Sequence, residues 1–89
     1  MFNSVHNFYE QLVFERILIV KKERNEPMDQ DCIEDIACIA LNHLPPRYIR
    51  HYIDLASRIG DGELEQLHEQ VKQVVDEAIV LAKRRHEPH

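Results

Sequence analysis

The stretch DIACIALNHLPPRYIRHYI, residues 35–53, decides the fold of this 89-residue chain. Ile36, Ala40 and Leu44 recur in its first half at helical spacing, which predicts a helix with one buried face. Two prolines then end the helix, because proline lacks an amide donor and disfavours helix at the residue before it. Arginines and tyrosines follow at once. We expect a turn that presents these side chains on a helical scaffold, which favours binding over catalysis.

The segment directly after the prolines fits two structures. Tyr48, Arg50 and Tyr52 alternate with other side chains, which is typical of a short extended piece. Tyr48, Tyr52 and Leu55 would equally line one face of a helical turn with Pro46 as its first residue. Of the two, we favour the helical turn.

Helices are also predicted on both sides of this stretch. The first spans about residues 4–24, with Asn3 or Ser4 as its cap. The central helix starts near Asp29 or Asp31, since acidic residues suit a helix N-terminus. The last helix follows a break at residues 60–62. Its apolar residues are spaced by three and four along one seam: Leu64, Leu67, Val71, Val74, Ala78 and Leu81, with Val75, Ile79 and Ala82 widening the stripe.

These patterns predict one all-α domain over residues 1–89, with three main helices and a short element after the Pro-Pro turn. So small a chain buries little surface, and we expect a homodimer. Phe14 lies off the main apolar stripe of the first helix, which favours a role at an interface. The seam of the last helix is the other candidate for dimerisation.

Composition excludes several classes of protein. A formal charge of −5 argues against general nucleic-acid binding. No apolar run approaches the ~18 residues of a membrane span, and the N-terminus lacks the pattern of a secretory signal, so we expect a cytoplasmic protein. Cys32 and Cys38 are six residues apart in a helical pattern, which is poor spacing for a disulfide, and we expect both to be reduced.

The central residues resemble those of the ComFB family of late competence development proteins. The residues that carry the likeness are Asp35-Ile36, Ala40-Leu41-Asn42 and Leu44-Pro45-Pro46-Arg47-Tyr48-Ile49, with weaker matches at Asn7-Phe8-Tyr9-Glu10 and Val75-Asp76-Glu77-Ala78-Ile79. The resemblance implies a mostly helical, non-enzymatic bacterial protein, often a homodimer, tied to competence and surface behaviour. Some cyanobacterial members are receptors for cyclic di-GMP.

One departure from the family concerns metal. Members often carry a cysteine cluster ahead of the Asp-Ile pair, which can hold zinc. Here Cys32 matches its last cysteine, but Asp29 stands where another thiol is expected. Asp31, Asp35 and Cys38 share one helical face near His43 without zinc-type spacing, so we predict no metal and no cofactor.

The candidate ligand site follows the prolines. Guanidinium groups bind phosphates and the guanine edge through forked hydrogen bonds, a carboxylate accepts from guanine N–H groups, and tyrosine stacks on bases. The residues we predict to bind ligand are Arg47, Tyr48, Arg50, Asp54 and Arg58. The alternative is that these arginines pair with the acidic residues 26–35 of the same chain or of a partner chain.

Enzyme activity is not expected. Cys38 and His43 have the residue types of a nucleophile and its base, but neither an oxyanion donor nor a glycine-rich elbow accompanies them. We therefore predict a cytoplasmic signalling protein that binds cyclic di-GMP and changes its affinity for an unknown downstream protein. The alternative is an adaptor, related to competence or motility, that binds only proteins.

Overall fold

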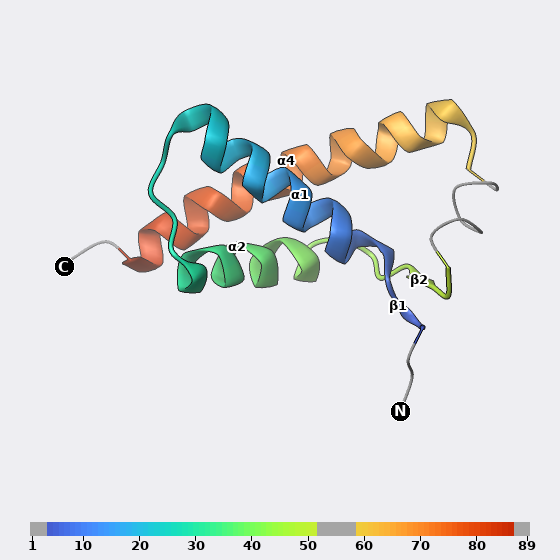
Figure 1. Ribbon diagram of the computed structural model, residues 1–89, viewed down its shortest axis with the longest axis horizontal. Coiled ribbons are helices and arrows are strands. Elements are labelled where there is room, and N and C mark those ends of the chain that lie inside the picture. Colours follow the sequence, from blue (N-terminus) through green and yellow to red (C-terminus); the bar gives the residue numbers. More distant parts are fainter. Residues whose placement is uncertain (1–3, 52–58, 87–89) are drawn as a thin grey trace.

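The computed structural model describes residues 4–51 and 59–86 of the chain. Within these ranges lie the helices α1 (Phe8–Arg24), α2 (Gln30–Asn42) and α4 (Asp61–His86) and the strands β1 (His6–Asn7) and β2 (Tyr48–Ile49). Each helix packs against the other two; α4 crosses α1, and α2 lies beneath the crossing (Figure 1). The predicted all-α class is confirmed, with a two-stranded sheet added to it.

Helix α1 begins later than the sequence predicts. Its N-cap is Asn7, whose side chain accepts a hydrogen bond from the backbone N–H of Tyr9 at 3.1 Å. The predicted start near Ser4 is wrong because His6 and Asn7 form β1 instead, and Asn3 lies outside the described residues. The helix ends where expected: Asn25, at a φ of 50°, adopts the left-handed conformation before Pro27.

Helix α2 begins as predicted. The side chain of Asp29 caps it by accepting from the backbone N–H of Cys32 at 2.8 Å. The helix ends at Asn42, shortly before the two prolines. Ile39, which the predicted stripe leaves out, is buried as well.

The core is apolar throughout, since the described ranges bury no polar or charged residue. All three helices contribute to it. The buried residues are Phe8, Tyr9, Leu12, Val13, Ile17 and Val20 from α1, Ile33, Ile36, Ile39 and Ala40 from α2, Leu67, Val71, Val75, Ala78, Ile79 and Ala82 from α4, and Met28 and Leu44 from the connections.

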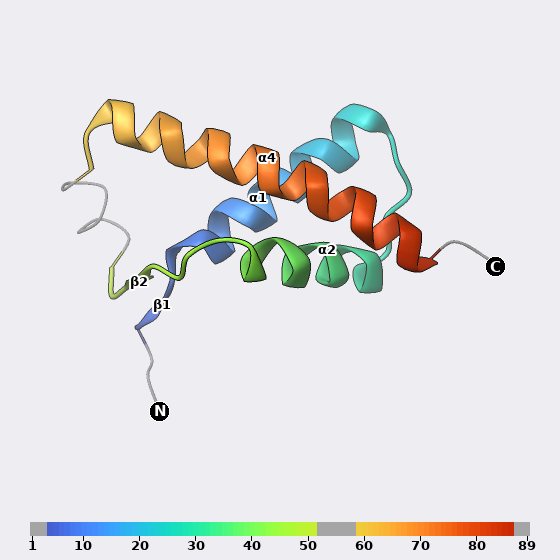
Figure 2. The same cartoon turned by 180° about the vertical axis from the view of Figure 1, so that it is seen from behind.

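The buried face of α4 is rotated from the predicted seam. Leu81 is 40% exposed, whereas Val75, Ile79 and Ala82 are at most 2% exposed. A strict three-four alternation suits a helix that follows one partner along a supercoil. Helix α4 instead crosses α1 and also packs on α2, as the view from behind shows (Figure 2), and so buries a broader face.

The helix favoured after the prolines is wrong at Tyr48 and Ile49. These two residues form β2, which pairs antiparallel with β1 in the register His6↔Ile49 and Asn7↔Tyr48. The extended alternative was therefore correct there, because a pairing strand comes from the other end of the fold. Tyr52 and Leu55 lie outside the described residues.

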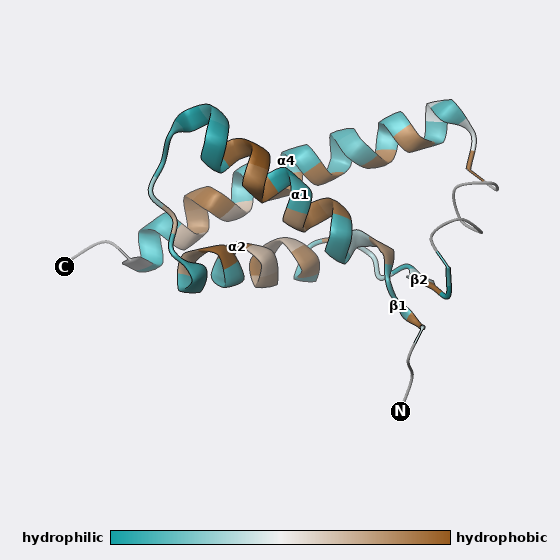
Figure 3. Cartoon of the chain, viewed as in Figure 1, coloured by the Kyte–Doolittle hydropathy of each residue, from teal (hydrophilic) through white to brown (hydrophobic). Residues whose placement is uncertain are grey.

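Several large apolar side chains remain exposed. The hydropathy colouring shows where apolar residues lie along the helices (Figure 3). Phe14 and Leu18, one turn apart on α1, are 48% and 41% exposed. Val80 of α4 is 51% exposed. The predicted position of Phe14 off the buried stripe is thus confirmed. None of the described helices combines the length and the apolar character needed to cross a membrane.

Candidate functional site: the turn after the two prolines

The LPPRY turn, residues 44–48, is fastened to the start of α1 through backbone atoms. Leu44 is 4% exposed and anchors the turn in the core. The backbone N–H of Arg47 donates to Oδ1 of Asn7 at 3.2 Å. The backbone N–H of Phe8 donates to the carbonyl oxygen of Arg47 at 2.7 Å. Position 47 is therefore held at both its N–H and its C=O.

The side chain of Arg47 reaches α4. Its Nη1 lies 3.3 Å from Oε1 of Glu63, in the first turn of that helix. The two side chains are 37% and 48% exposed, so water screens this ion pair. Residues 26–35 supply no partner for Arg47 within the chain; Glu26 of that segment pairs with Lys83 at 2.9 Å instead. The ion pair that Arg47 forms within the chain is therefore with Glu63 of α4 and not with the acidic segment 26–35.

Tyr48 and Arg50 lie on the other side of the segment. Exposure alternates from Arg47 to Arg50: positions 47 and 49 are half-buried, and positions 48 and 50 are exposed. Successive side chains of a strand point to opposite faces, and residues two apart share one face. Tyr48 is 68% exposed, and no hydrogen bond or ion pair joins Arg50 to another residue of ranges 4–51 and 59–86.

The structure therefore divides the predicted site. Tyr48, in β2, and Arg50, which follows the end of β2, are both exposed. Arg47 belongs to the inner side, against Glu63. Asp54 and Arg58 lie outside the described residues. Sequence reasoning missed Glu63, although its place in the first turn of a helix near an arginine-rich segment was a usable signal.

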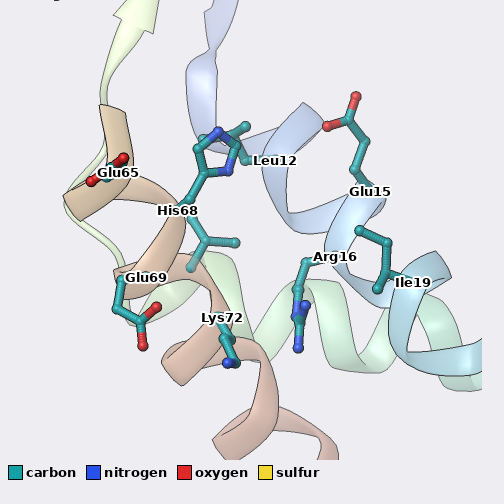
Figure 4. A pocket seen from close by; sticks show the side chains of 9 residues that line it. Leu12, Glu15, Arg16, Ile19, Glu65, His68, Glu69 and Lys72 are labelled. Carbon is teal, nitrogen blue, oxygen red and sulfur yellow. The ribbon is translucent and has the colours of Figure 1, made fainter. Parts of the chain in front are cut away.

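A second feature that sequence reasoning missed is a cavity of about 450 Å³ between α1 and α4. In the close-up, Arg16 of α1 and Lys72 of α4 reach toward the same end of this cavity, and Glu15 turns away (Figure 4). The Nε atom of Arg16 is buried and has no hydrogen-bond partner among the described residues. A buried N–H without a partner destabilises the fold. The remaining lining residues are Leu12, Ile19, Glu65, His68, Glu69 and Val71.

The cysteines are both free thiols. Burial raises the pKa of the Cys32 thiol, and the charges of Asp29, Asp35 and Glu26 raise it further. Lys83 acts in the opposite direction. The raised pKa disfavours the Cys32 thiolate, which is the form that binds metal and attacks electrophiles.

Metal-ligand types are dispersed in the structure. In the two ranges described, no three His, Cys, Asp or Glu residues lie close enough together to hold a metal ion. The Asp29 carboxylate is engaged as the cap of α2. Cys38 and His43, considered from the sequence as a nucleophile and base, both border a groove between α2 and α4. The ring Nδ1 of His43 faces the carbonyl oxygen of Ile39 at 2.7 Å rather than the thiol.

Comparison with protein families gives one match. Residues 6–86 fit the family model described as late competence development protein ComFB. The matched range holds every helix and both strands that the structure describes, and the LPPRY turn lies inside it. Neither a curated protein nor a solved structure matches the chain.

Proposed function

The chain belongs to the ComFB family of late competence development proteins, and we propose that it binds cyclic di-GMP through the outer side of β2 and acts on a downstream protein. One observation carries this proposal: Tyr48 in β2 and Arg50 just after it are both exposed, and the segment is fixed through β1 and Arg47 to the start of α1. Because the backbone is already held in place, binding has a smaller ordering cost, which is confined to the exposed side chains and the ligand.

The chemistry of this pair suits a cyclic dinucleotide. A guanidinium can bind a phosphate, or guanine O6 and N7, through two parallel hydrogen bonds. A tyrosine ring can stack on the base. A spacing of two residues along a strand lets one side chain take the base and the other its phosphate or edge.

Arg47 has a secondary part in this proposal. Its ion pair with Glu63 is more than one-third exposed on both sides, so it is weak and can exchange for a phosphate contact. Such an exchange would separate the start of α4 from the LPPRY turn. A partner protein that binds this part of the surface could then distinguish the ligand-bound protein from the free protein.

We also propose that the protein is a non-enzymatic homodimer. Core packing within the chain occupies the buried face of α4, and the exposed pair Phe14 and Leu18 on α1 offers a separate apolar surface. Sedimentation of wild type and Phe14→Ser tests this assignment. We expect a dimer that dissociates in the variant; a monomeric wild type contradicts it.

The alternative function is an adaptor that binds only proteins. Its support is the acidic surface around the start of α2, where Glu23, Asp31 and Glu34 are exposed. Such a surface could meet the arginines of another copy or partner. Under this alternative, Arg50→Ala weakens association and no nucleotide binds.

Calorimetric titration of variants tests the proposed site. Arg50→Ala and Tyr48→Ala should each weaken cyclic di-GMP binding roughly tenfold or more, the loss expected for a charge-assisted hydrogen bond or a stacked ring. Lys22→Ala is the control, because it removes an exposed cation at the far end of α1. Equal weakening in the control would reduce the effect to overall charge and contradict the site.

A further inference from the structure

The proposed function does not use the groove between α2 and α4. It encloses about 640 Å³ and is bordered on α2 by Cys38, Ile39, Asn42 and His43, and on α4 by Leu81, Arg84 and Arg85. The two helices run in opposite directions, so the arginines and the end of α2 lie toward opposite ends of the groove (Figure 2). Its lining includes His43, which directly precedes the LPPRY turn, but none of the residues of the turn itself.

One end of the groove offers two cations that form no ion pair with another described residue. Three and four positions before Arg84 and Arg85 lie Val80, Leu81 and Ala82, so no acid precedes them at helical contact spacing. The neighbouring Lys83 pairs with Glu26, whereas neither arginine forms an ion pair with any residue of ranges 4–51 and 59–86. The groove lining contains no acidic residue, in a chain whose net charge is −5.

The other end offers hydrogen-bond acceptors. The amide Nδ2 of Asn42 donates to the carbonyl oxygen of Cys38 at 2.9 Å, which leaves Oδ1 as an acceptor. The ring Nδ1 of His43 lies 2.7 Å from the carbonyl oxygen of Ile39 and must donate to it. In the neutral ring, Nε2 is then the acceptor. The end of α2 therefore carries two acceptors on consecutive residues, Oδ1 of Asn42 and Nε2 of the neutral His43 ring.

An apolar surface connects the two ends. Ile39 is buried in the floor, and Leu81 is 40% exposed beside it. A flat ring can cover such a surface and remove it from water. Cations at one end, acceptors at the other and an apolar middle match a molecule with a phosphate, an aromatic ring and a ring amine.

We propose that this groove binds a purine nucleoside monophosphate. Arg84 and Arg85 bind the phosphate, Ile39 and Leu81 contact the ring, and the exocyclic amino group of the base donates to the Asn42 and His43 acceptors. This site is independent of the cyclic di-GMP site proposed for Tyr48 and Arg50.

Calorimetry with AMP and GMP tests the inference, with ribose 5-phosphate and adenosine as ligands that each lack one half. We expect both nucleotides to bind and each half alone to bind roughly tenfold more weakly or worse. If ribose 5-phosphate binds as tightly as AMP, the groove recognises only the phosphate and not the base. Adenosine binding as tightly as AMP would remove the role of the arginines. Either result, or no binding of AMP and GMP, overturns the inference.

Variants locate the site. The double substitution Arg84→Gln and Arg85→Gln, and separately Asn42→Ala, should weaken AMP binding roughly tenfold or more; all three side chains are exposed, so folding should persist. Lys72→Gln is the matched control. Lys72 also lies on α4 but lines the cavity against α1 instead of this groove, so the variant should bind AMP as wild type does. Unchanged AMP binding in the double variant contradicts the inference.

The two ligand sites can be told apart. Arg50→Ala should leave AMP binding unchanged. Loss of AMP binding in that variant would contradict the proposal that AMP binds in the groove, and would place its binding at the LPPRY turn instead. The opposite result is loss of cyclic di-GMP binding in the double arginine variant with binding retained in Arg50→Ala. It would support the groove as a nucleotide site and contradict the cyclic di-GMP site proposed at Tyr48 and Arg50.

Discussion

The side-chain oxygen of Asn7 joins the beginning of α1 to Arg47, forty residues further along the chain. One atom, Oδ1, accepts from the backbone N–H of Tyr9 at 3.1 Å and from that of Arg47 at 3.2 Å. The first bond caps a helix, and the second fixes the turn that carries the candidate ligand residues. Asn7 therefore couples the stability of α1 to the position of Arg47.

Replacing Asn7 by alanine removes both bonds from a half-buried position. We expect Asn7→Ala to lower the free energy of unfolding by about 1–2 kcal/mol, the loss expected for a helix cap and an interior hydrogen bond. Urea denaturation followed by circular dichroism measures it. Asn7→Asp keeps the acceptor and is the control; equal destabilisation in both variants would mean that the oxygen has no such role.

The rotated face of α4 gives a comparison between two identical deletions. Val75 is 0% exposed and Val80 is 51% exposed. We expect Val75→Ala to lower the free energy of unfolding by about 2 kcal/mol, because it leaves a cavity in the core. Val80→Ala should change it by less than about 0.5 kcal/mol. Similar values for the two variants in urea denaturation would contradict the packing described for α4.

The unpartnered Nε of Arg16 predicts a stabilising substitution. Arg16→Met keeps much of the apolar stem and removes the buried N–H, so it should raise the free energy of unfolding by about 1 kcal/mol. Arg24→Met is the control, since the Arg24 guanidinium lies 3.2 Å from Asp76 and should not gain in the same way. A loss of stability in Arg16→Met would show that the guanidinium has a partner in solution.

The raised pKa of Cys32 predicts slow alkylation. Only the thiolate reacts, and a raised pKa in the folded state moves thiolate formation to higher pH. In a Cys38→Ser variant, the pH at which iodoacetamide labelling reaches half its maximal rate should be higher when the protein is folded than when it is unfolded in urea. A midpoint at or below that of the unfolded chain would contradict the environment described for Cys32.

Local chemistry was enough to predict the helical elements. Asp29 begins α2 and Pro27 follows the end of α1, because caps and prolines act within a few residues. The choice between strand and helix at Tyr48 and Ile49 could not be made from the local sequence, because the pairing strand is more than forty residues away. The exposure of Leu81 likewise depends on how α4 crosses its two neighbours.

For the candidate site, the sequence supplied residue types and not their arrangement. The residue types after the prolines favour an anion, and Tyr48 and Arg50 are both exposed. Arg47 points away from Tyr48 because successive side chains of an extended segment alternate between its two sides. The helical turn favoured from the sequence did not predict this alternation. The partner of Arg47, Glu63, comes from another helix, and such a contact depends on tertiary packing.

Titration of the purified wild-type protein with cyclic di-GMP, beside cyclic di-AMP and GTP, tests the central claim most directly. The account predicts saturable binding of cyclic di-GMP at roughly micromolar concentration or below, with no comparable binding of the other two. No heat of binding at roughly several hundred micromolar cyclic di-GMP would contradict it and favour the adaptor.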